Sequence, residues 1–313
     1  MTVKRFLLPF VAAYAIAAPL FAEVTVTRGT DRIDVAIGGK PFTTLYLGGA
    51  ATKPYLHPLR AADGKIVTRR FPMEMVEGES RDHKHHRGLW FSHGDVNGIN
   101  FWENEASYAP DRPNIGPIVP EKPAKITSGK DKGTIDVLFD WKDTKGKVLL
   151  TETRKMIFYD KPAERVIDFD IVLKAVEKVT FTDTKEGTFA IRLADSMSEK
   201  KGGLMTNAEG AKGMKNVWGK PSPWVEYVGD VEGEKIAVAI LDHPGNPKHP
   251  TYWHSRDYGL FAANIFGEHD FFDDKKRNGA VTIEPGKELR FRYRVIIEAP
   301  GADLAKAYAA YSK

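Results

Sequence analysis

Polar and apolar residues alternate with a period of two along much of this chain, and this pattern constrains the fold more than any other feature. The clearest stretches are 24–27, 32–37, 134–139, 166–173 and 289–297. Successive side chains of a β-strand point to opposite faces, so each stretch predicts a strand with one buried face. Glycine-containing turn pairs separate the stretches. The chain is therefore expected to fold mainly as β-sheet.

One stretch predicts a helix. Residues 302–311 are rich in alanine and carry Asp303 in the first turn, which suits a helix N-terminus. The proline-rich stretch 110–123 indicates a surface loop, and no break in composition marks a linker between domains. We predict an all-β fold, a sandwich of antiparallel sheets with a short C-terminal helix, in which residues 23–313 form a single domain.

The N-terminus predicts a signal peptide over residues 1–22. Lys4 and Arg5 supply a positive start, an apolar stretch follows, and Ala22 ends a plausible cleavage site. No later segment approaches the ~20 apolar residues that a membrane-spanning helix needs. We therefore expect a periplasmic or secreted protein with no membrane span once the signal peptide is removed.

Composition argues against several classes of function. The 46 basic and 42 acidic residues nearly balance and no dense basic run occurs, so a nucleic-acid partner is not expected. With no cysteine, the chain has neither thiolate metal sites nor a cysteine nucleophile. It also lacks the Gly-x-Ser-x-Gly elbow, the P-loop and the dinucleotide-binding glycine motif. The expected ligand is small and mostly neutral.

Four of the nine histidines lie between residues 82 and 95, flanked by two aspartates. Histidine is the side chain whose unperturbed pKa lies nearest neutrality, so it exchanges protons or binds metals at working pH. The segment leads directly into an apolar, aromatic strand pattern. It therefore predicts a polar pocket built on a sheet.

The pair Asn97 and Gly98 predicts a two-residue hairpin turn, because a type I′ turn needs a positive φ at both positions. In this register, one face carries a polar set and the other an apolar set: His93, Asp95, Asn100 and Trp102 against Trp90, Val96, Ile99 and Phe101. A tryptophan beside polar side chains suits a sugar, because the indole packs on ring C–H groups while polar groups bind hydroxyls. The alternative is that Trp102 is partly buried and His93 only satisfies a backbone group.

His83 and His85 would share one face of an extended strand, and His86 would point the other way. With a third ligand from elsewhere in the chain, His83 and His85 would form a divalent metal site. A solvated loop with balanced charges explains the same pattern equally well. His93 would lie ~26 Å from His85 along an extended strand, so a four-histidine metal site is not expected.

A second polar cluster lies between residues 242 and 272. Alternation in 251–256 aligns Tyr252, His254 and Arg256 on one face and turns Trp253 inward. A histidine beside an arginine suits the polarisation of a carbonyl or the binding of a hydroxyl. The alternative is an edge strand with a solvated Arg256.

A third candidate is the stretch 186–192. Its apolar Phe189 and Ile191 look like core, which leaves Glu186 and Arg192 on the opposite face. Glu186 would act as an acid or base if it paired with a histidine. The alternative is a structural ion pair between these two residues.

Several of these motifs together resemble a known family. They are Tyr-Leu-His-Pro-Leu at 55–59, Asp-His-Lys-His-His-Arg-Gly-Leu-Trp-Phe at 82–91, His-Gly-Asp-Val-Asn-Gly at 93–98, and the stretches 249–256 and 258–264. They resemble exported bacterial proteins named "methane oxygenase PmoA", also treated as a domain of unknown function. The name is not taken as the function, because the membrane-bound methane oxygenase subunit has many membrane spans. This chain has one N-terminal apolar segment, followed by strand patterns.

A more distant likeness to galactose mutarotase-like proteins implies a β-supersandwich. In that fold a histidine acid and a carboxylate base act on a pyranose. The likeness does not assign the acid and the base to particular residues of this chain, and a fold by itself does not fix a function.

The leading prediction is an exported carbohydrate-active enzyme that uses histidine and carboxylate acid–base chemistry for epimerisation, elimination or hydrolysis. The catalytic candidates are His85, His86 and His254, which would transfer protons, and Arg192 and Arg256, which would stabilise negative charge. The candidates for substrate binding are His93, Asp95, Asn100, Trp102 and Glu186.

Two other classes of function stay open. The first is a carbohydrate-binding protein without catalysis, which needs the aromatic surface but not the proton chemistry. The second is a metal-dependent oxidoreductase, with His83 and His85 as ligands of a divalent metal. No other cofactor is indicated by the sequence.

Overall fold

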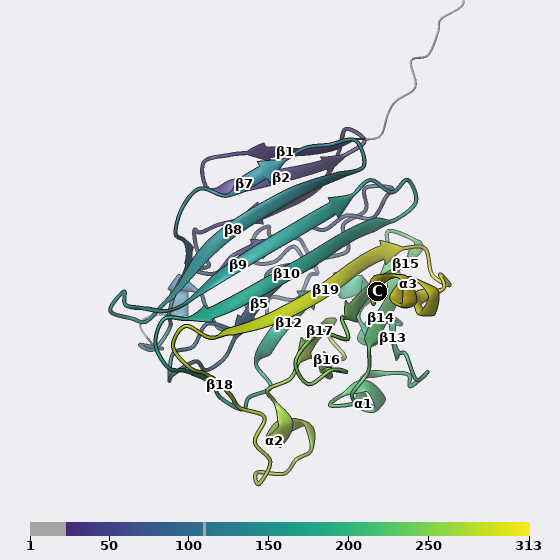
Figure 1. Ribbon diagram of the computed structural model, residues 1–313. Helices are drawn as coiled ribbons and strands as arrows, with labels where there is room; N and C mark the ends of the chain where they lie inside the picture. Colours follow the sequence, from purple (N-terminus) through teal and green to yellow (C-terminus); the bar gives the residue numbers. More distant parts are fainter. Residues whose placement is uncertain (1–22, 109–110) are drawn as a thin grey trace, which may run out of the picture.

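The computed structural model describes residues 23–108 and 111–313, and strands dominate it (Figure 1). The first large sheet has eight antiparallel strands. In spatial order they are β1 (Val24–Arg28), β2 (Arg32–Ile37), β3 (Lys40–Tyr46), β4 (Tyr55–Leu56), β5 (Leu89–His93), β12 (Gly187–Arg192), β17 (Leu260–Asn264) and β16 (Tyr252–Arg256). Strands β5 and β12 are neighbours although about ninety residues separate them in the chain, so this sheet depends on long-range pairing.

The second large sheet has nine strands, also antiparallel. Eight follow one another in space: β13 (Leu204–Asn207), β14 (Trp224–Val231), β15 (Glu234–Asp242), β19 (Glu288–Glu298), β10 (Arg165–Ala175), β9 (Val148–Tyr159), β8 (Lys132–Lys142) and β6 (Ile118–Pro120). Strand β7 (Lys125–Thr127) also pairs with β8. A small third sheet joins β11 (Val179–Phe181) to β18 (Val281–Ile283).

The two large sheets pack face to face, and the core lies between them. In Figure 1 the long strands β8, β9, β10 and β19 are in front and the eight-stranded sheet lies behind them. Aromatic pairs cross the interface, as Phe91 of β5 does with Phe291 of β19 at 5.6 Å between ring centroids. Phe169 and Phe189 meet in the same way at 4.8 Å. The period-two pattern of the sequence thus reflects one face of each strand buried in this core.

A buried ion pair lies among these apolar side chains. Glu152 and Arg154, both on β9, are almost fully buried, and Arg154 Nε lies 2.5 Å from Glu152 Oε1. The other carboxylate oxygen of Glu152 accepts a hydrogen bond from the Trp141 indole at 2.8 Å. The guanidinium also lies over the Phe91 and Phe139 rings. Each charge has a partner, as burial demands.

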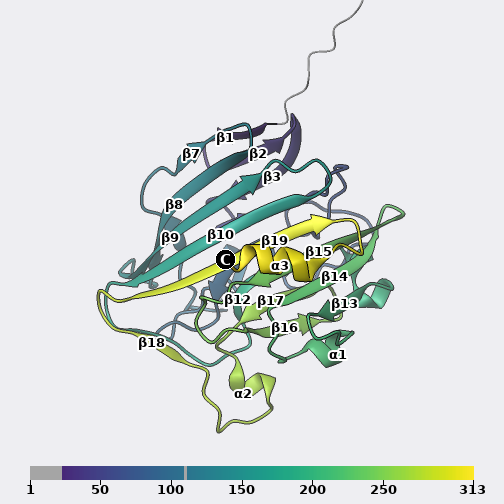
Figure 2. The ribbon, with the colours of Figure 1, turned by 45° about the vertical axis from the view of Figure 1, so that its right-hand side comes forward.

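Helices are short. They are α1 (Met214–Val217), α2 (Glu268–Phe271) and α3 (Leu304–Tyr311), and α3 lies against the outer face of the nine-stranded sheet (Figure 2). There Leu304 packs with Val166, Leu241 and Ile296. The Asp303 side chain caps the helix by accepting a hydrogen bond from the Lys306 amide at 2.9 Å.

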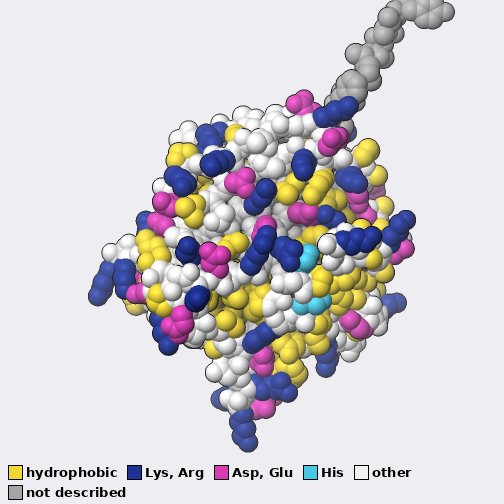
Figure 3. All heavy atoms as spheres, viewed as in Figure 1, with side chains coloured by type: hydrophobic (Ala, Val, Ile, Leu, Met, Phe, Trp, Pro, Cys, Tyr) yellow, Lys and Arg dark blue, Asp and Glu magenta, His cyan; other side chains and the backbone are white. Residues whose placement is uncertain are grey.

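The predicted fold class is confirmed: sheets are antiparallel, strands prevail and a short helix ends the chain. The helix begins at Leu304, two residues later than the alanine pattern suggested. The predicted signal peptide, 1–22, lies outside the described residues. Among the residues described, no helix is long and apolar enough to cross a membrane. Basic and acidic side chains are interspersed on the face shown in Figure 3.

Candidate functional site

The outer face of the eight-stranded sheet carries a row of side chains that ends at a histidine. Trp90 of β5 pairs with Ala190 of β12, Ala190 pairs with Ala262 of β17, and Ala262 pairs with His254 of β16. All four side chains are buried although they point away from the sandwich core. Other side chains must therefore cover them.

Part of that cover is a continuous stack of four rings. It runs from Tyr258 through His83 and His86 to Trp90, with ring centroids 5.2, 4.7 and 5.4 Å apart. The planes of successive rings differ by 17°, 4° and 22°. His83 is partly exposed whereas His86 and Trp90 are buried, so the stack leads from the surface to the floor of the site.

The rings continue on the other side of the row. Trp102 lies 5.0 Å from Trp90 and 6.3 Å from His254, and Trp218 meets the His254 ring edge-on at 5.3 Å. We call this set the histidine–aromatic cluster: His83, His85, His86, Trp90, Trp102, Trp218, His254 and Tyr258. The cluster joins the predicted segments 82–95 and 249–256 in one place.

A buried arginine shapes the loop that carries three of the histidines. Arg69 donates hydrogen bonds to the carbonyls of Asp82, His83 and His86 at 2.9, 2.8 and 3.3 Å. At Gly88 the chain turns into β5 with φ +52°, and a Cβ there would lie 2.1 Å from the Leu56 carbonyl oxygen. Only glycine fits that position, so the loop and the strand join in a fixed geometry.

One carboxylate serves two buried guanidinium groups beside this loop. Asp82 forms ion pairs with Arg69 and, at 2.9 Å, with Arg192. It also lies 3.1 Å from the His83 ring nitrogen. Burial pushes the Asp82 pKa upward, but the His83 hydrogen bond and the two arginine charges outweigh it and hold this pKa well below its usual value. Asp82 is therefore ionised at neutral pH.

The contact with Arg192 also fixes the tautomer of His86. Arg192 Nη1 lies 3.4 Å from His86 Nδ1, and a guanidinium can only donate, so Nδ1 accepts. Burial, with His85 and Arg192 as further causes, lowers the His86 pKa well below its usual value. The ring is therefore neutral and carries its proton on Nε2. That N–H has no partner among the described residues.

Unpaired buried polar atoms concentrate in this cluster. Those without a hydrogen-bond partner among the described residues include His85 Nδ1, His86 Nε2, Trp90 Nε1, Trp102 Nε1 and both ring nitrogens of His254, and beside the cluster Ser92 Oγ, two residues from Trp90 on the same face of β5. Buried polar groups in proteins are nearly always paired, and an unpaired one in a native fold points to strain, catalysis, or a bound water or ligand. So many on one face indicate a site for a polar molecule.

Three histidines of the cluster, His85, His86 and His254, are held neutral by lowered pKa values. Burial is the main cause, and it lowers the His85 pKa to about 2. The His254 pKa also lies well below its usual value, through burial and then the charge of Arg256, which outweigh the opposing effect of the Lys185 backbone. A neutral imidazole offers one acceptor and one donor nitrogen, which suits the hydroxyl groups of a sugar.

A lysine that sequence reasoning missed lies under the two tryptophans. Lys53 is fully buried, donates to the Trp102 carbonyl and has its Nζ 5.0 Å from the Trp90 ring centroid. Burial lowers its pKa to about 7, although the charge of Glu105 opposes this. Nearby, Arg87 and Glu105 form a buried ion pair, with Nη2 2.8 Å from Oε2. No motif around Lys53 signals this position.

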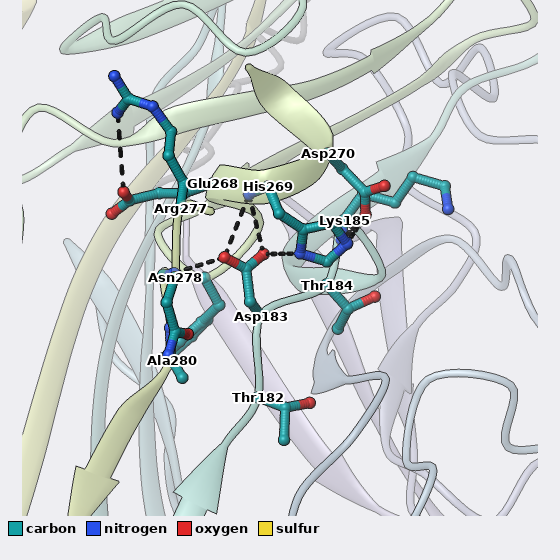
Figure 4. A network of polar contacts seen from close by, with 12 residues as sticks. Thr182, Asp183, Thr184, Lys185, Glu268, His269, Asp270, Arg277, Asn278 and Ala280 are labelled. Carbon is teal, nitrogen blue, oxygen red and sulfur yellow. Dashed lines mark hydrogen bonds and ion pairs between the residues drawn. The ribbon is translucent and has the colours of Figure 1, made fainter. Parts of the chain in front are cut away.

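The turn that carries Glu186 is fixed by a polar network next to the cluster (Figure 4). Asp183 binds the ring and the amide of His269, and Asp270 accepts from the Lys185 amide at 2.9 Å. Asn264 donates to the Lys185 carbonyl at 3.0 Å. Burial raises the Glu186 pKa, although the Lys185 charge, 3.4 Å away, opposes the shift. Glu186 thus stands at the edge of the site as a weakly acidic carboxyl group.

The predicted shared face of His93, Asp95, Asn100 and Trp102 is wrong. The Asn97-Gly98 turn exists, with Val96 paired to Ile99, but beyond that pair only one bond crosses the hairpin among the described backbone hydrogen bonds, from the Phe101 amide to the His93 carbonyl at 3.0 Å. Gly94 donates instead to the Glu186 carbonyl, and Asn100 donates to the carbonyl of Asn114 at 2.8 Å. Pairing with distant strands replaces the extended hairpin.

His93 faces the sandwich core rather than the cluster. Its ring packs on Phe181 and Phe266, and Nε2 lies 2.8 Å from the Thr182 carbonyl, as the alternative interpretation stated. Asp95 accepts from the Gly98 amide within the turn. Asn100 accepts from the amides of Trp102 and Glu103. Of the four residues, Trp102 alone belongs to the cluster.

The structure also places the remaining residues that the sequence singled out. Trp253 turns into the core, as predicted, and His254 lies on the opposite face. Trp90, expected on the apolar face, belongs to the site. Arg192 pairs with Asp82, not with Glu186. His83 and His85 lie 5.7 Å apart between ring centroids, and no group of three or more His, Cys, Asp or Glu in the described ranges is arranged to hold a metal.

One surface cavity lies beside the cluster. It measures about 420 Å³ and is lined by the β16–β17 turn residue Asp257, by Met214 of α1, and by Glu199, Lys200, Lys212, Gly213, Lys215 and Asn216. Lys200 Nζ also lies 5.9 Å from the Tyr258 ring, so the cavity lies next to the outer end of the stack of rings.

No curated protein sequence matches this chain. Among solved structures, a galactose 1-epimerase from Lactobacillus acidophilus NCFM is similar with a TM-score of 0.41 and 6% identity, over 88% of this chain and 98% of that one. A galactose mutarotase-like protein from Lactobacillus casei ATCC 334 aligns with a TM-score of 0.37 and 7% identity, over 88% and 100%.

An alpha-galactosidase from Lactobacillus brevis aligns with a TM-score of 0.43 and 10% identity, over 89% of this chain. This chain spans about 40% of the length of that enzyme. All these TM-scores lie below 0.5, so the likenesses carry no argument about the site or its chemistry. The resemblance to the proteins named after methane oxygenase stays an expectation. A family model matches residues 32–312, and the chain therefore belongs to that family, described as a family of unknown function (DUF6807).

Proposed function

We propose that this protein is an enzyme that acts on a small carbohydrate by acid–base chemistry at the histidine–aromatic cluster. The observation that carries the proposal is the concentration of unpaired, buried donors and acceptors on an aromatic face, above all both ring nitrogens of His254. A sugar has the matching chemistry, because its hydroxyls both donate and accept while its C–H faces pack on indole rings. The predicted location, periplasmic or secreted, is part of the proposal.

The proposed roles follow from the protonation states. His254 is neutral and one ring nitrogen is an acceptor, so it takes a proton from a sugar hydroxyl or carbon as general base. Glu186, whose pKa is raised by burial, holds a proton more readily than an exposed glutamate and suits the general acid. His86 offers its Nε2–H as a fixed hydrogen-bond donor. Whether the reaction is epimerisation, elimination or hydrolysis depends on the leaving group of the sugar.

The test is turnover of a panel of free sugars, oxidised sugars and methyl glycosides, followed by NMR with and without EDTA. His254→Gln keeps a polar side chain but removes the base, and should lower turnover by about a hundredfold or more. Its thermal unfolding midpoint should change less than turnover does, since the His254 ring interacts with the Lys185 backbone but makes no hydrogen bond of ordinary geometry among the described residues. Equal loss of turnover and stability would contradict the catalytic role of His254.

His93→Gln is the matched control, because His93 is equally buried but faces the core. It should lose stability through the Thr182 contact while turnover per folded molecule is retained. If His93→Gln lowers turnover as much as His254→Gln does, the site is not confined to the outer face. Turnover abolished by EDTA would favour the metal-dependent alternative.

One observation favours a carbohydrate-binding protein without catalysis. Burial lowers the pKa values of His85, His86 and His254 far below 7, so none of these three is tuned near the pH at which a histidine exchanges protons most readily. Such a protein would bind sugars with no change in affinity between about pH 5 and 8 and return them unchanged. Sugar signals that shift without conversion in the NMR panel would support this second candidate.

A further inference from the structure

The charges around the histidine–aromatic cluster do not cancel. Most cations there are ion-paired: Arg69 and Arg192 with Asp82, Arg87 with Glu105, Arg112 with Glu103, and Lys185 with Glu186. Three cations, Lys53, Lys84 and Arg256, have no carboxylate within ion-pair distance among the described residues. Lys53 is fully buried and Lys84 is exposed on the histidine loop, whereas Arg256 is partly buried against an aromatic ring of the cluster and so is the unpaired cation best placed to bind a ligand there.

Arg256 is held in place without a counter-charge. It ends strand β16, and its guanidinium carbon lies 4.1 Å over the Trp218 ring. Its side-chain hydrogen bond is a long one, 3.5 Å, to the Ser255 carbonyl. Glu186 is close enough for its pKa to respond to Arg256, yet its ion pair is with Lys185. A planar guanidinium stacked on an indole still has its N–H edges free to bind a carboxylate with two hydrogen bonds.

The part of the cluster nearest to Arg256 also suits a ligand that carries a carboxylate. His254 is two residues from Arg256 on the same face of β16, is buried, and has both ring nitrogens unpaired. Trp218 touches both side chains, since it meets the His254 ring edge-on and carries Arg256 on its face. A ligand that binds here meets a cation, a neutral imidazole and an indole together.

The surface cavity beside the β16–β17 turn is also lined by basic side chains. The cavity of about 420 Å³ beside the β16–β17 turn is lined by Lys200, Lys212 and Lys215 and by two acids, Glu199 and Asp257. Glu199 is occupied with the backbone amides of Met205 and Met214. Its carboxylate is thus less available to offset the lysines. Asp257 pairs with Lys200 at 3.5 Å, but Lys212 and Lys215 have no carboxylate within ion-pair distance among the described residues, so an anionic ligand is favoured in this cavity as well as at Arg256.

We propose that the site takes a sugar with a carboxylate, such as a uronic acid, and that Arg256 binds the carboxylate while His254 faces the ring. The proposal rests on the proposed function, because it needs a sugar at the cluster. It revises the mostly neutral ligand that the overall charge balance suggested. A carboxylate is preferred to a phosphate because one unpaired guanidinium matches a single negative charge.

The experiment compares the affinities of methyl β-D-glucuronide and methyl β-D-glucoside, which differ at one carbon, by NMR titration at neutral pH. The uronide should bind about tenfold more tightly or better, as expected of a charge-assisted pair of hydrogen bonds. In Arg256→Gln the two affinities should come within about twofold of each other. Arg256→Lys, which keeps the charge but not the planar fork, should lie between.

Arg290→Gln is the control for the loss of one positive charge, because Arg290 pairs with Asp170 on the other sheet. It should leave the preference unchanged. Equal binding of uronide and glucoside by the wild type would overturn the inference and leave the proposed function standing. Preference that survives in Arg256→Gln, or tighter binding of glucose 6-phosphate than of the uronide, would also overturn it. Binding of none of these sugars would instead count against the proposed function.

Discussion

At the scale of single residues, Asp82 has the largest electrostatic role in the site. Its carboxylate is the shared partner of Arg69 and Arg192, whose side chains are fully buried. Because Arg69 also binds three carbonyls of the histidine loop, Asp82 stabilises the loop through that arginine. Removing the carboxylate would leave two buried cations with little compensation.

Asp82→Asn should therefore lower the free energy of unfolding at pH 7 by about 2 kcal/mol, below the usual cost for a buried pair because Asp82 is partly exposed. The folded pKa of Asp82 is depressed, so its contribution is fully present above the unfolded value of about 3.9, begins to fall as the pH drops past that value, and is lost only as the pH falls through the much lower folded pKa. Denaturant unfolding between about pH 6 and 3 measures this. A wild type whose stability falls no more steeply with acid than that of Asp82→Asn would contradict the assignment.

Two strands, β5 and β16, show how far the sequence predicted which side chains face the core. Alternation in β5 was predicted correctly, but the faces were exchanged: His93 lies inside and Trp90 outside. Leu89 and Phe91 share the face of His93, and these two apolar neighbours were the available signal that this face is the core. In β16 the same reasoning succeeded, because Trp253 marked the inner face and so placed His254 outside.

At the scale of elements, strands and turns follow from local pattern, whereas the loop at 82–88 does not. The Asn97-Gly98 turn and the C-terminal helix were predictable from their own residues. The histidine loop is shaped by Arg69 and covered by Tyr258 and Trp102, all distant in sequence. Nothing in the pattern of residues 82–88 indicates these partners, so neither the ring stack nor the role of Lys53 could be predicted.

Helix α3 is attached to the nine-stranded sheet by a polar chain. His249 Nδ1 lies 2.7 Å from Asp242, and a hydrogen bond of 3.1 Å joins His249 Nε2 to the Tyr308 hydroxyl. Tyr308→Phe should cost about 1 kcal/mol and lower the melting temperature by about 2 °C. Sugar binding should not change, since α3 lies on the outer face of the other sheet. An unchanged melting temperature would show that this bond does not hold the helix.

At the scale of the whole molecule, the sandwich buries polar groups in two places, the site and the core, and the two places differ. The site has buried polar atoms that a ligand can pair, whereas the core pair Glu152 and Arg154 is already complete. A buried pair of this kind is more costly to break than to replace as a unit. Mutations in the two places should therefore have different effects: those at the site should alter function, and those at the core ion pair should alter stability.

Arg154→Met should lower the free energy of unfolding by about 3–5 kcal/mol, because Glu152 would stay charged and unpaired in the core. Adding Glu152→Gln removes that charge and keeps an acceptor for the Trp141 indole, so the double variant should recover part of the loss. Chemical denaturation of the four proteins gives the coupling energy. A double variant less stable than Arg154→Met would contradict the interpretation.

The most direct test of the account is a ¹H–¹⁵N NMR titration of the histidine ring nitrogens with methyl β-D-glucuronide and methyl β-D-glucoside. We expect neutral rings for His86 and His254 and shifts of their nitrogen signals when a sugar binds. The signals of His93 and His249, which lie in the core and beside α3, should not move. Sugar binding that leaves His86 and His254 unchanged would contradict the central claim that the histidine–aromatic cluster is the site.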